Sequence, residues 1–289
     1  MTLKIVLGAA QFGLSYGVAN NNGQVTTQEL KKIIQLAKQA NISKLDTAIV
    51  YGNSEKALGN IGISDWNIIT KIPEAPTEVR DIKSWVYSET QNSLNRLNTS
   101  RLYAVMLHTT SILSSDNAKE YWDALQELKQ QGVVQKIGYS IYNPGELDEY
   151  YGKYYPDIIQ APYNILDNRL KKSGWLQKLS DDAVEVHVRS VFLQGLLLMN
   201  KNQRPSYFKR WSELWQKWHS WLSLRNITAL EATLWFVLQE DLIDNVVVGV
   251  DSADHLQDIL DALGECHNIT VTDFLSEDLN LIDPSHWKF

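Results

Sequence analysis

Short apolar runs alternate along the chain with longer segments in which apolar residues recur at the spacing of one helix face. The first run is followed by a segment that opens with Thr-Thr-Gln-Glu, a sequence typical of a helix start. The pattern predicts eight strands: Leu3–Leu7, Lys44–Asp46, Trp66–Lys71, Leu102–His108, Val134–Tyr139, Ile158–Gln160, Val184–Val188 and Asn245–Val248. The predicted helices are Thr27–Ala40, Ser54–Asn60, Val79–Leu97, Ala118–Gln130, a short one after Pro144, one near Arg169–Lys178, and His255–Leu263.

Strands that alternate with helices in this way predict an α/β protein with a parallel sheet. Eight such units within 289 residues favour a closed (β/α)8 TIM barrel that forms a single domain over residues 1–289. The rival fold is a doubly wound sheet. It normally carries a G-x-G-x-x-G sequence after the first strand, and Gly8-Ala-Ala-Gln-Phe-Gly13 lacks that spacing.

About 55 residues separate the seventh and eighth predicted strands, which is enough for two helices. Four tryptophans in this insertion recur at spacings of four, three and three residues, so they share one helix face. They are Trp211, Trp215, Trp218 and Trp221. Such a stripe is typical of a helix that packs on a barrel, and the alternative is a surface that stacks carbohydrate or forms a dimer.

Composition narrows the classes of function. The 27 Lys and Arg residues against 34 Asp and Glu give a net charge of −7 with no basic run, which disfavours nucleic-acid binding. The single Cys266 permits no internal disulfide and suits a reducing compartment. The longest apolar stretches are too short for a membrane span or a signal peptide, so we expect a cytoplasmic protein with no membrane partner.

Four titratable side chains fall at or just after the ends of three consecutive predicted strands. Asp46, Lys71 and His108 close strands two, three and four, and Tyr51 lies five residues after Asp46. In a barrel these positions meet at the rim that carries catalytic groups. A lysine lowers the pKa of a neighbouring tyrosine from about 10, and an aspartate keeps that lysine charged. The tyrosine can then protonate a developing alkoxide, while a neutral histidine polarises a carbonyl.

Each of these residues alone has a plainer explanation. A single aspartate or lysine at a strand end usually belongs to a structural ion pair, and a lone tyrosine usually packs. We expect no metal, because a metal-dependent hydrolase on this barrel needs paired histidines and none of the six histidines is so placed. A phosphate-binding isomerase needs glycine-rich loops after strands seven and eight, where Gly195 and Gly249 stand isolated.

The sequence around these residues resembles the aldo-keto reductase family. Residues 45–59 are similar to its D-T-A-x-x-Y-G-x-S-E-x-x-L-G signature, and residues 132–140 to its G-K-V-R-x-I-G-V-S segment. The resemblance covers nearly the whole chain. It implies a barrel oxidoreductase that reduces an aldehyde or ketone, and it makes the four rim residues catalytic, with Tyr51 as general acid. The N-terminal hairpin usual in the family is absent here, because the first strand begins almost at Met1.

The same resemblance implies a nicotinamide cofactor, NADP(H) by the habit of the family, with NAD(H) as the alternative. Ser140 and Gln160 would hold the nicotinamide carboxamide. Residues 246–260 resemble the segment that holds the adenosine end, where Asp251 and Asp254 disfavour a 2′-phosphate. The full set expected at the cofactor is Ser140, Gln160, Arg189, Ser190, Phe192, Gly195, Gly249, Ser252 and His255.

Three further expectations concern the substrate and the partners of the protein. Arg189 stands where the family has an aromatic residue that stacks on nicotinamide. Three roles are open for its guanidinium: it stacks on the nicotinamide ring, pairs with a rim carboxylate or binds an anionic substrate. The apolar tail Leu275–Phe289 packs either on the outer helices or at the substrate mouth, where Trp287 would face Tyr51. We expect a small-molecule carbonyl substrate, such as a sugar derivative, and a monomer or weak homo-oligomer. The alternative function is a catalytically silent, nucleotide-binding sensor or partner subunit.

Overall fold

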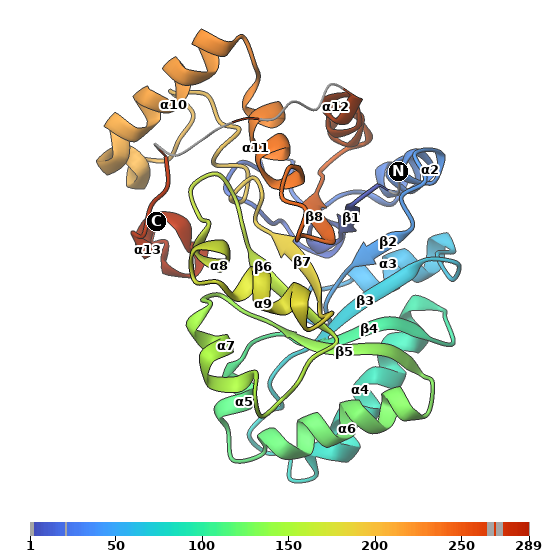
Figure 1. The fold of residues 1–289 in the computed structure, drawn as a ribbon. Helices are drawn as coiled ribbons and strands as arrows, with labels where there is room; N and C mark the ends of the chain where they lie inside the picture. Colours follow the sequence, from blue (N-terminus) through green and yellow to red (C-terminus); the bar gives the residue numbers. More distant parts are fainter. Residues whose placement is uncertain (1–2, 21, 265–268, 270–273, 289) are drawn as a thin grey trace.

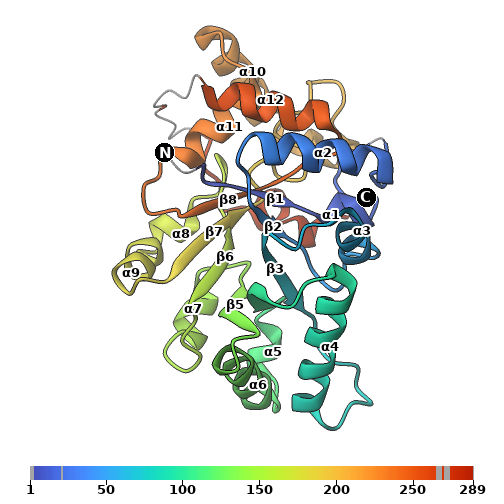
Figure 2. The same ribbon diagram turned by 90° about the vertical axis from the view of Figure 1, so that its right-hand side faces the viewer.

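Eight parallel strands close into a barrel in the computed structural model, which describes residues 3–20, 22–264, 269 and 274–288. The strands follow one another around the barrel in sequence order, with helices on the outside (Figures 1 and 2). This arrangement confirms the (β/α)8 prediction and excludes the doubly wound sheet. The strands are β1 (Ile5–Gly8), β2 (Lys44–Asp46), β3 (Asn67–Ile72), β4 (Leu102–Leu107), β5 (Val134–Ser140), β6 (Ile158–Pro162), β7 (Glu185–Arg189) and β8 (Asn245–Gly249).

The helices lie close to the predicted ranges, with one clear exception. The helix predicted near Arg169–Lys178 is two short helices, because the chain turns at Gly174 with a φ of +83° that favours glycine. The helices are α1 (Ala10–Gly13), α2 (Thr27–Gln39), α3 (Ser54–Ile61), α4 (Ile82–Leu97), α5 (Ser111–Ser114), α6 (Ala118–Gln130), α7 (Gly145–Tyr150), α8 (Arg169–Lys172), α9 (Trp175–Asp181), α10 (Ser212–Arg225), α11 (Ala229–Leu238), α12 (Ala253–Gly264) and α13 (Leu279–Ile282), with two 3-10 helices, η1 (Ser206–Trp211) and η2 (Pro284–His286). None of the helices in the described ranges is long and apolar enough to cross a membrane.

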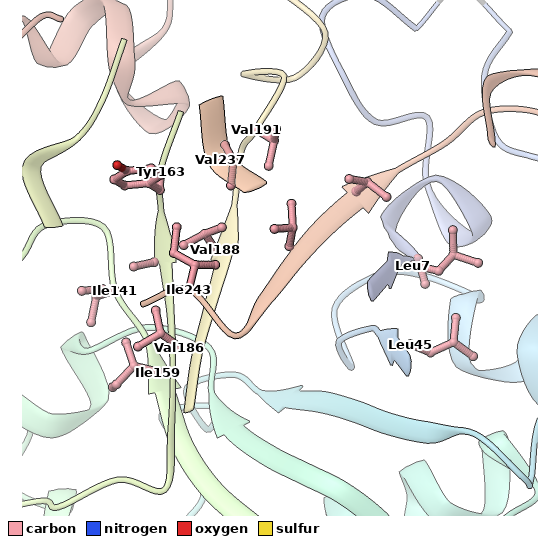
Figure 3. Packing of buried hydrophobic residues seen from close by; sticks show 14 of the residues in the cluster. Leu7, Leu45, Ile141, Ile159, Tyr163, Val186, Val188, Val191, Val237 and Ile243 are labelled. Carbon is pink, nitrogen blue, oxygen red and sulfur yellow. The ribbon is translucent and has the colours of Figure 1, made fainter. Parts of the chain in front are cut away.

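Alternation along the strands separates two apolar regions. Ile5 and Leu7 of β1 belong to the main core between strands and helices, whereas Val6 between them belongs to a small cluster inside the barrel. Figure 3 shows part of the main core, in which Ile159 and Val186 are register partners on β6 and β7. Packing on both sides of each strand therefore fixes the strands, so that their carboxyl ends meet at one rim.

A cluster of polar side chains occupies the amino-terminal end of the barrel, opposite the rim. The carboxylate of Glu185 on β7 pairs with Lys44 of β2 at 3.1 Å and with Lys136 of β5. The same carboxylate accepts from the hydroxyl of Tyr103 on β4 and lies 2.6 Å from Nε2 of the buried His187. Four strands are thus joined by side chains at this end, in addition to their backbone ladder.

The tryptophans of the insertion between β7 and β8 serve packing, as the simpler interpretation predicts. Trp215 and Trp218 of α10 are buried, and their indole N–H groups donate to backbone carbonyls. Trp221 stacks on Trp218, with 5.7 Å between ring centroids. Trp211 lies in η1, before α10 begins, so the four residues do not form one continuous helical stripe.

The C-terminal tail docks on segments that follow β6 and β7, beside α8 and α10 (Figure 1). Ser276 N donates to Leu166 O at 2.8 Å, and Leu281 is fully buried. The ring of Trp287 meets Phe208 of η1 edge-on at 4.9 Å. The tail therefore packs on the chain segments of the rim. Cys266 and Phe289 lie outside the described residues.

Candidate active site

A buried ion pair lies at the carboxyl ends of β2 and β3. Lys71 Nζ donates to Asp46 Oδ2 at 2.6 Å and to Thr47 O at 3.1 Å, and both charged side chains are almost fully buried. The positions follow from the strand register, since Asp46 pairs with Ile69 and Lys71 lies one pleat further along β3. Burial lowers the pKa of Lys71, and the charge of Asp46 opposes that shift. The predicted pairing of these two residues is present.

The second oxygen of Asp46 is also bonded. Gln160 Nε2, in the middle of β6, donates to Asp46 Oδ1 at 2.7 Å from across the barrel. Ser140 of β5 is the register partner of Gln160, and both side chains are buried. The structure therefore brings the two residues expected at the nicotinamide carboxamide into one place, and it ties one of them to the ion pair. Sequence spacing held no signal for the bond between Gln160 and Asp46.

Tyr51 lies above this pair, in the turn between β2 and α3. Its ring contacts the imidazole of His108 edge-on at 5.8 Å, and Lys71 Nζ lies 5.5 Å from the ring centroid. The turn is confined by the short helix α1, because a Cβ at Gly13 would lie 1.7 Å from the carbonyl oxygen of Tyr51. Gly13 is thus a positioning residue that the sequence analysis did not identify, and only glycine allows this close approach.

The pKa of Tyr51 is raised above its ordinary value of 10.0, mainly by burial and next by the negative charge of Asp46. The sequence analysis expected a pKa below the ordinary value of about 10, and that expectation is wrong. The physical reason is that burial and the charge of Asp46 both disfavour the tyrosinate. Tyr51 therefore holds its proton at neutral pH, as a proton donor must.

His108 lies at the end of β4 with a pKa lowered from 6.5 to about 4, first by burial and then by the charge of Lys71. We expect it to stay neutral as pH falls to about 4. The unfolded chain takes up this proton near pH 6.5, so the contribution of His108 to stability is present above pH 6.5 and is lost as pH falls toward 4. An NMR titration of its ring proton, assigned with a His108→Gln variant, checks this. A midpoint near 6.5 would contradict the buried placement.

Arg189 ends β7 at the same rim. Its guanidinium donates to Ser190 Oγ at 3.2 Å and to the carbonyl of Ile141 at 3.1 Å, and it stacks on the ring of Tyr142 at 4.5 Å. The positive charge of Arg189 acts on two of the candidate catalytic residues. It lowers the pKa of His108, and it opposes the rise in the pKa of Tyr51 that burial causes. Among the described residues it makes no ion pair, so the rim carboxylate considered in the sequence analysis is not its partner.

The other residues expected at the cofactor are spread along the loops after β7 and β8. Ser190 and Phe192 are half-buried in the first loop, and Gly195 lies against Ala19 of the loop after β1. Gly249 ends β8 beside the side chain of Gln11. Ser252 Oγ accepts from the backbone N–H of the exposed His255 at the start of α12. These residues come from two loops, and within the first of them Gly195 N donates to Phe192 O at 2.9 Å.

The start of α12 already holds a carboxylate from elsewhere in the chain. Helices α2 and α12 pack side by side (Figure 2), and Glu29 Oε1 of α2 accepts from Ala253 N at 2.8 Å. Lys32 pairs with the other oxygen of Glu29 at 3.0 Å. The bond from Ala253 is the main reason that the pKa of Glu29 is lowered.

In the described ranges, no group of three or more His, Cys, Asp or Glu residues is arranged to hold a metal ion.

Comparisons with known proteins agree with this geometry. The sequence model described as "Aldo/keto reductase family" matches residues 4–273. An "Uncharacterized oxidoreductase YqkF" of Bacillus subtilis (strain 168) is 24% identical over 250 residues, which cover 80% of each chain. The "NADH-specific methylglyoxal reductase" of Escherichia coli (strain K12) is 28% identical over 206 residues, which cover 61% of this chain and 60% of that protein.

Solved structures of similar fold include the holo form of "aldo-keto reductase AKR11C1 from Bacillus halodurans". It superposes with a TM-score of 0.74 at 22% identity and covers 94% of this chain and 89% of its own. A "putative aldo-keto reductase from Pseudomona aeruginosa" superposes with a TM-score of 0.63 at 20% identity and covers 90% of each chain. At these identities the structures support the barrel fold.

Proposed function

The chain belongs to the aldo/keto reductase family, and from that premise we propose that it reduces a small aldehyde or ketone with hydride from a nicotinamide cofactor. The observation that carries the proposal is the buried pair of Lys71 and Asp46 directly below the Tyr51 ring. A buried charged pair at the carboxyl ends of barrel strands contributes little to stability, which favours a role in chemistry.

The roles of the side chains follow from their protonation states. Tyr51 keeps its proton near neutral pH and donates it to the oxygen of the reduced carbonyl. His108, as a neutral imidazole, aligns that oxygen by a hydrogen bond. Lys71 is held in place by Asp46, and its positive charge stabilises the tyrosinate that forms once the proton has left.

The residues at the rim fit a nicotinamide group. Ser140, at the end of β5, offers a hydroxyl, and its register partner Gln160 on β6 offers an amide, so a carboxamide there can both donate and accept. When bound, the cofactor supplies the hydride. We assign the loops after β7 and β8, with Ser190, Phe192 and Gly195 in the first, to the rest of the dinucleotide.

The direct test is carbonyl-dependent oxidation of the reduced cofactor by the purified protein. A panel of aldehydes, ketones and sugar derivatives is assayed with NADH and with NADPH, while cofactor binding is followed by fluorescence. Turnover with any member supports a reductase. Binding without turnover across the panel would instead favour the silent nucleotide-binding sensor.

Cofactor choice depends on the start of α12. We place the adenosine end of the cofactor there, where the carboxylate of Glu29 already occupies the N–H of Ala253, and Asp251 and Asp254 add negative charge nearby. A 2′-phosphate carries about two negative charges and is repelled at such a site. The NADH-specific relative from Escherichia coli supports the same choice. We therefore propose that NAD(H) is used at least as readily as NADP(H).

The ratio of kcat/KM with NADPH to kcat/KM with NADH is therefore expected to be about 1 or lower. Replacing Glu29 with Gln removes one negative charge and is expected to move the ratio toward NADPH by about threefold to tenfold. The control is Glu120→Gln, the same substitution in the first turn of α6. An unchanged ratio in the Glu29 variant would show that this carboxylate does not act on the cofactor.

A further inference from the structure

One positive charge at the rim has no carboxylate partner. Arg189 makes no ion pair among the described residues, and its two recorded hydrogen bonds go to a hydroxyl and a backbone carbonyl. A guanidinium has five N–H donors, so these two bonds leave donors for a ligand. A cation in this position is stable because the stacked ring of Tyr142 lies 4.5 Å away, a distance typical of a cation–π contact.

The four candidate catalytic residues and Arg189 together carry one positive charge. Lys71 and Asp46 cancel each other, His108 is neutral at pH 7, and Tyr51 is protonated. Arg189 is the charge that remains, in a chain whose net charge is −7. A local charge opposite in sign to that of the whole protein marks a place where anions are attracted.

The surroundings hold Arg189 in a fixed orientation. The backbone N–H of Tyr142 donates to Glu146 at 3.0 Å, and the carbonyl of Tyr142 accepts from Arg169 at 3.1 Å. These two bonds hold the backbone of Tyr142 on both sides of its Cα, and so fix the point from which the ring under the guanidinium extends. A cation positioned in advance binds a planar anion with less loss of entropy than a mobile one.

A second donor lies on the opposite loop. The hydroxyl of Tyr16, in the segment after α1, accepts from Gln194 at 3.3 Å, so its own proton is free to donate. The residue is 40% exposed, and the charges of Tyr51 and Arg189 both act on its titration. A hydroxyl from the loop after β1 therefore lies within the electrostatic reach of Arg189.

We propose that Arg189 binds an anionic group of the substrate, and that the substrate is a carbonyl compound carrying a carboxylate or a phosphate within a few bonds of the reacting carbon. This inference rests on the proposed function, because it names the substrate class of the same site. In this proposal the side chain of Arg189 binds the substrate, whereas the loop backbone around it binds the cofactor.

Matched pairs of substrates test the proposal. Succinate semialdehyde is compared with its methyl ester, and glyceraldehyde 3-phosphate with glyceraldehyde, so that each pair differs in one anionic group. We expect kcat/KM to favour the anionic member of at least one pair by about 10- to 100-fold, the range for a hydrogen bond to a charged group. The first pair reports on carboxylates and the second on phosphates.

Replacing Arg189 with Met is expected to remove most of the preference within a pair, because KM for the anionic member should rise by a similar factor relative to KM for the neutral member. Arg189→Lys keeps the charge and should retain part of the preference. The control is Arg225→Met, which removes an exposed arginine stacked at 4.5 Å on Trp221 in α10, away from the rim.

Two outcomes would overturn the inference. Equal kcat/KM for both members of each pair would show that no anion is recognised. Equal losses for both members in the Arg189→Met variant, together with weaker binding of NADH, would assign Arg189 to the cofactor. Neither outcome touches the proposed function, which fails only if no carbonyl in the panel is reduced.

Discussion

Replacing Tyr51 with Phe is expected to lower kcat by about 10²- to 10⁴-fold, the range for loss of a positioned general acid. The substitution removes only the hydroxyl, and the ring keeps its edge-on contact with His108 and its place near Lys71. The Kd for the cofactor, followed by fluorescence titration, is therefore expected to stay the same. Steady-state rates of carbonyl reduction at pH 7 provide the measurement.

The same change at a tyrosine away from the rim provides the control. Tyr87 of α4 donates to Glu127 on the outer helices, so Tyr87→Phe should leave kcat unchanged. If Tyr51→Phe reduced carbonyls at the normal rate, the general acid would have to be another group. If the variant lost cofactor binding as well, Tyr51 would have to act in binding.

Replacing Lys71 with Met is expected to reduce both activity and stability. The variant leaves the carboxylate of Asp46 buried with one donor, Gln160, and without its countercharge. Removing one partner of a buried ion pair costs about 3–5 kcal/mol of unfolding free energy, because the remaining charge stays desolvated. Urea denaturation at pH 7 measures this loss.

A double variant separates the two effects. In Lys71→Met with Asp46→Asn no buried charge remains, so most of the lost stability should return while activity stays low. Near-wild-type stability in the single Lys71→Met variant would show that water or another group solvates Asp46. Restored activity in the double variant would contradict the role given to the lysine.

The barrel and the positions of the candidate site residues at its rim could be predicted from the sequence, because both depend on the order of strands along the chain. Apolar runs give the strands, and residues at strand ends must meet at one rim once the strands are parallel. Asp46 and Lys71 were placed by this argument, and the structure shows them bonded at 2.6 Å. The expected roles of the site residues remain proposals.

Contacts between distant segments could not be predicted in the same way. The bond from Gln160 to Asp46 crosses the barrel, and the bond from Ala253 to Glu29 joins segments 224 residues apart. Neither leaves a periodic signal in the sequence. The sequence analysis expected the pKa of Tyr51 to be lowered, and it is raised. The nearby lysine could be identified from residue spacing, whereas the burial that raises the pKa depends on the whole fold.

The cluster around Glu185 has a consequence for engineering of this barrel. Its side chains come from β2, β4, β5 and β7, and they hold those strands together at the end away from the reaction. The loops at the carboxyl-terminal end of the barrel take no part in these side-chain contacts. They can therefore be exchanged, lengthened or randomised in a library while the barrel stays closed. A directed-evolution campaign on this chain should therefore leave Lys44, Lys136 and Glu185 untouched and vary rim positions outside those assigned to Tyr51 and the cofactor.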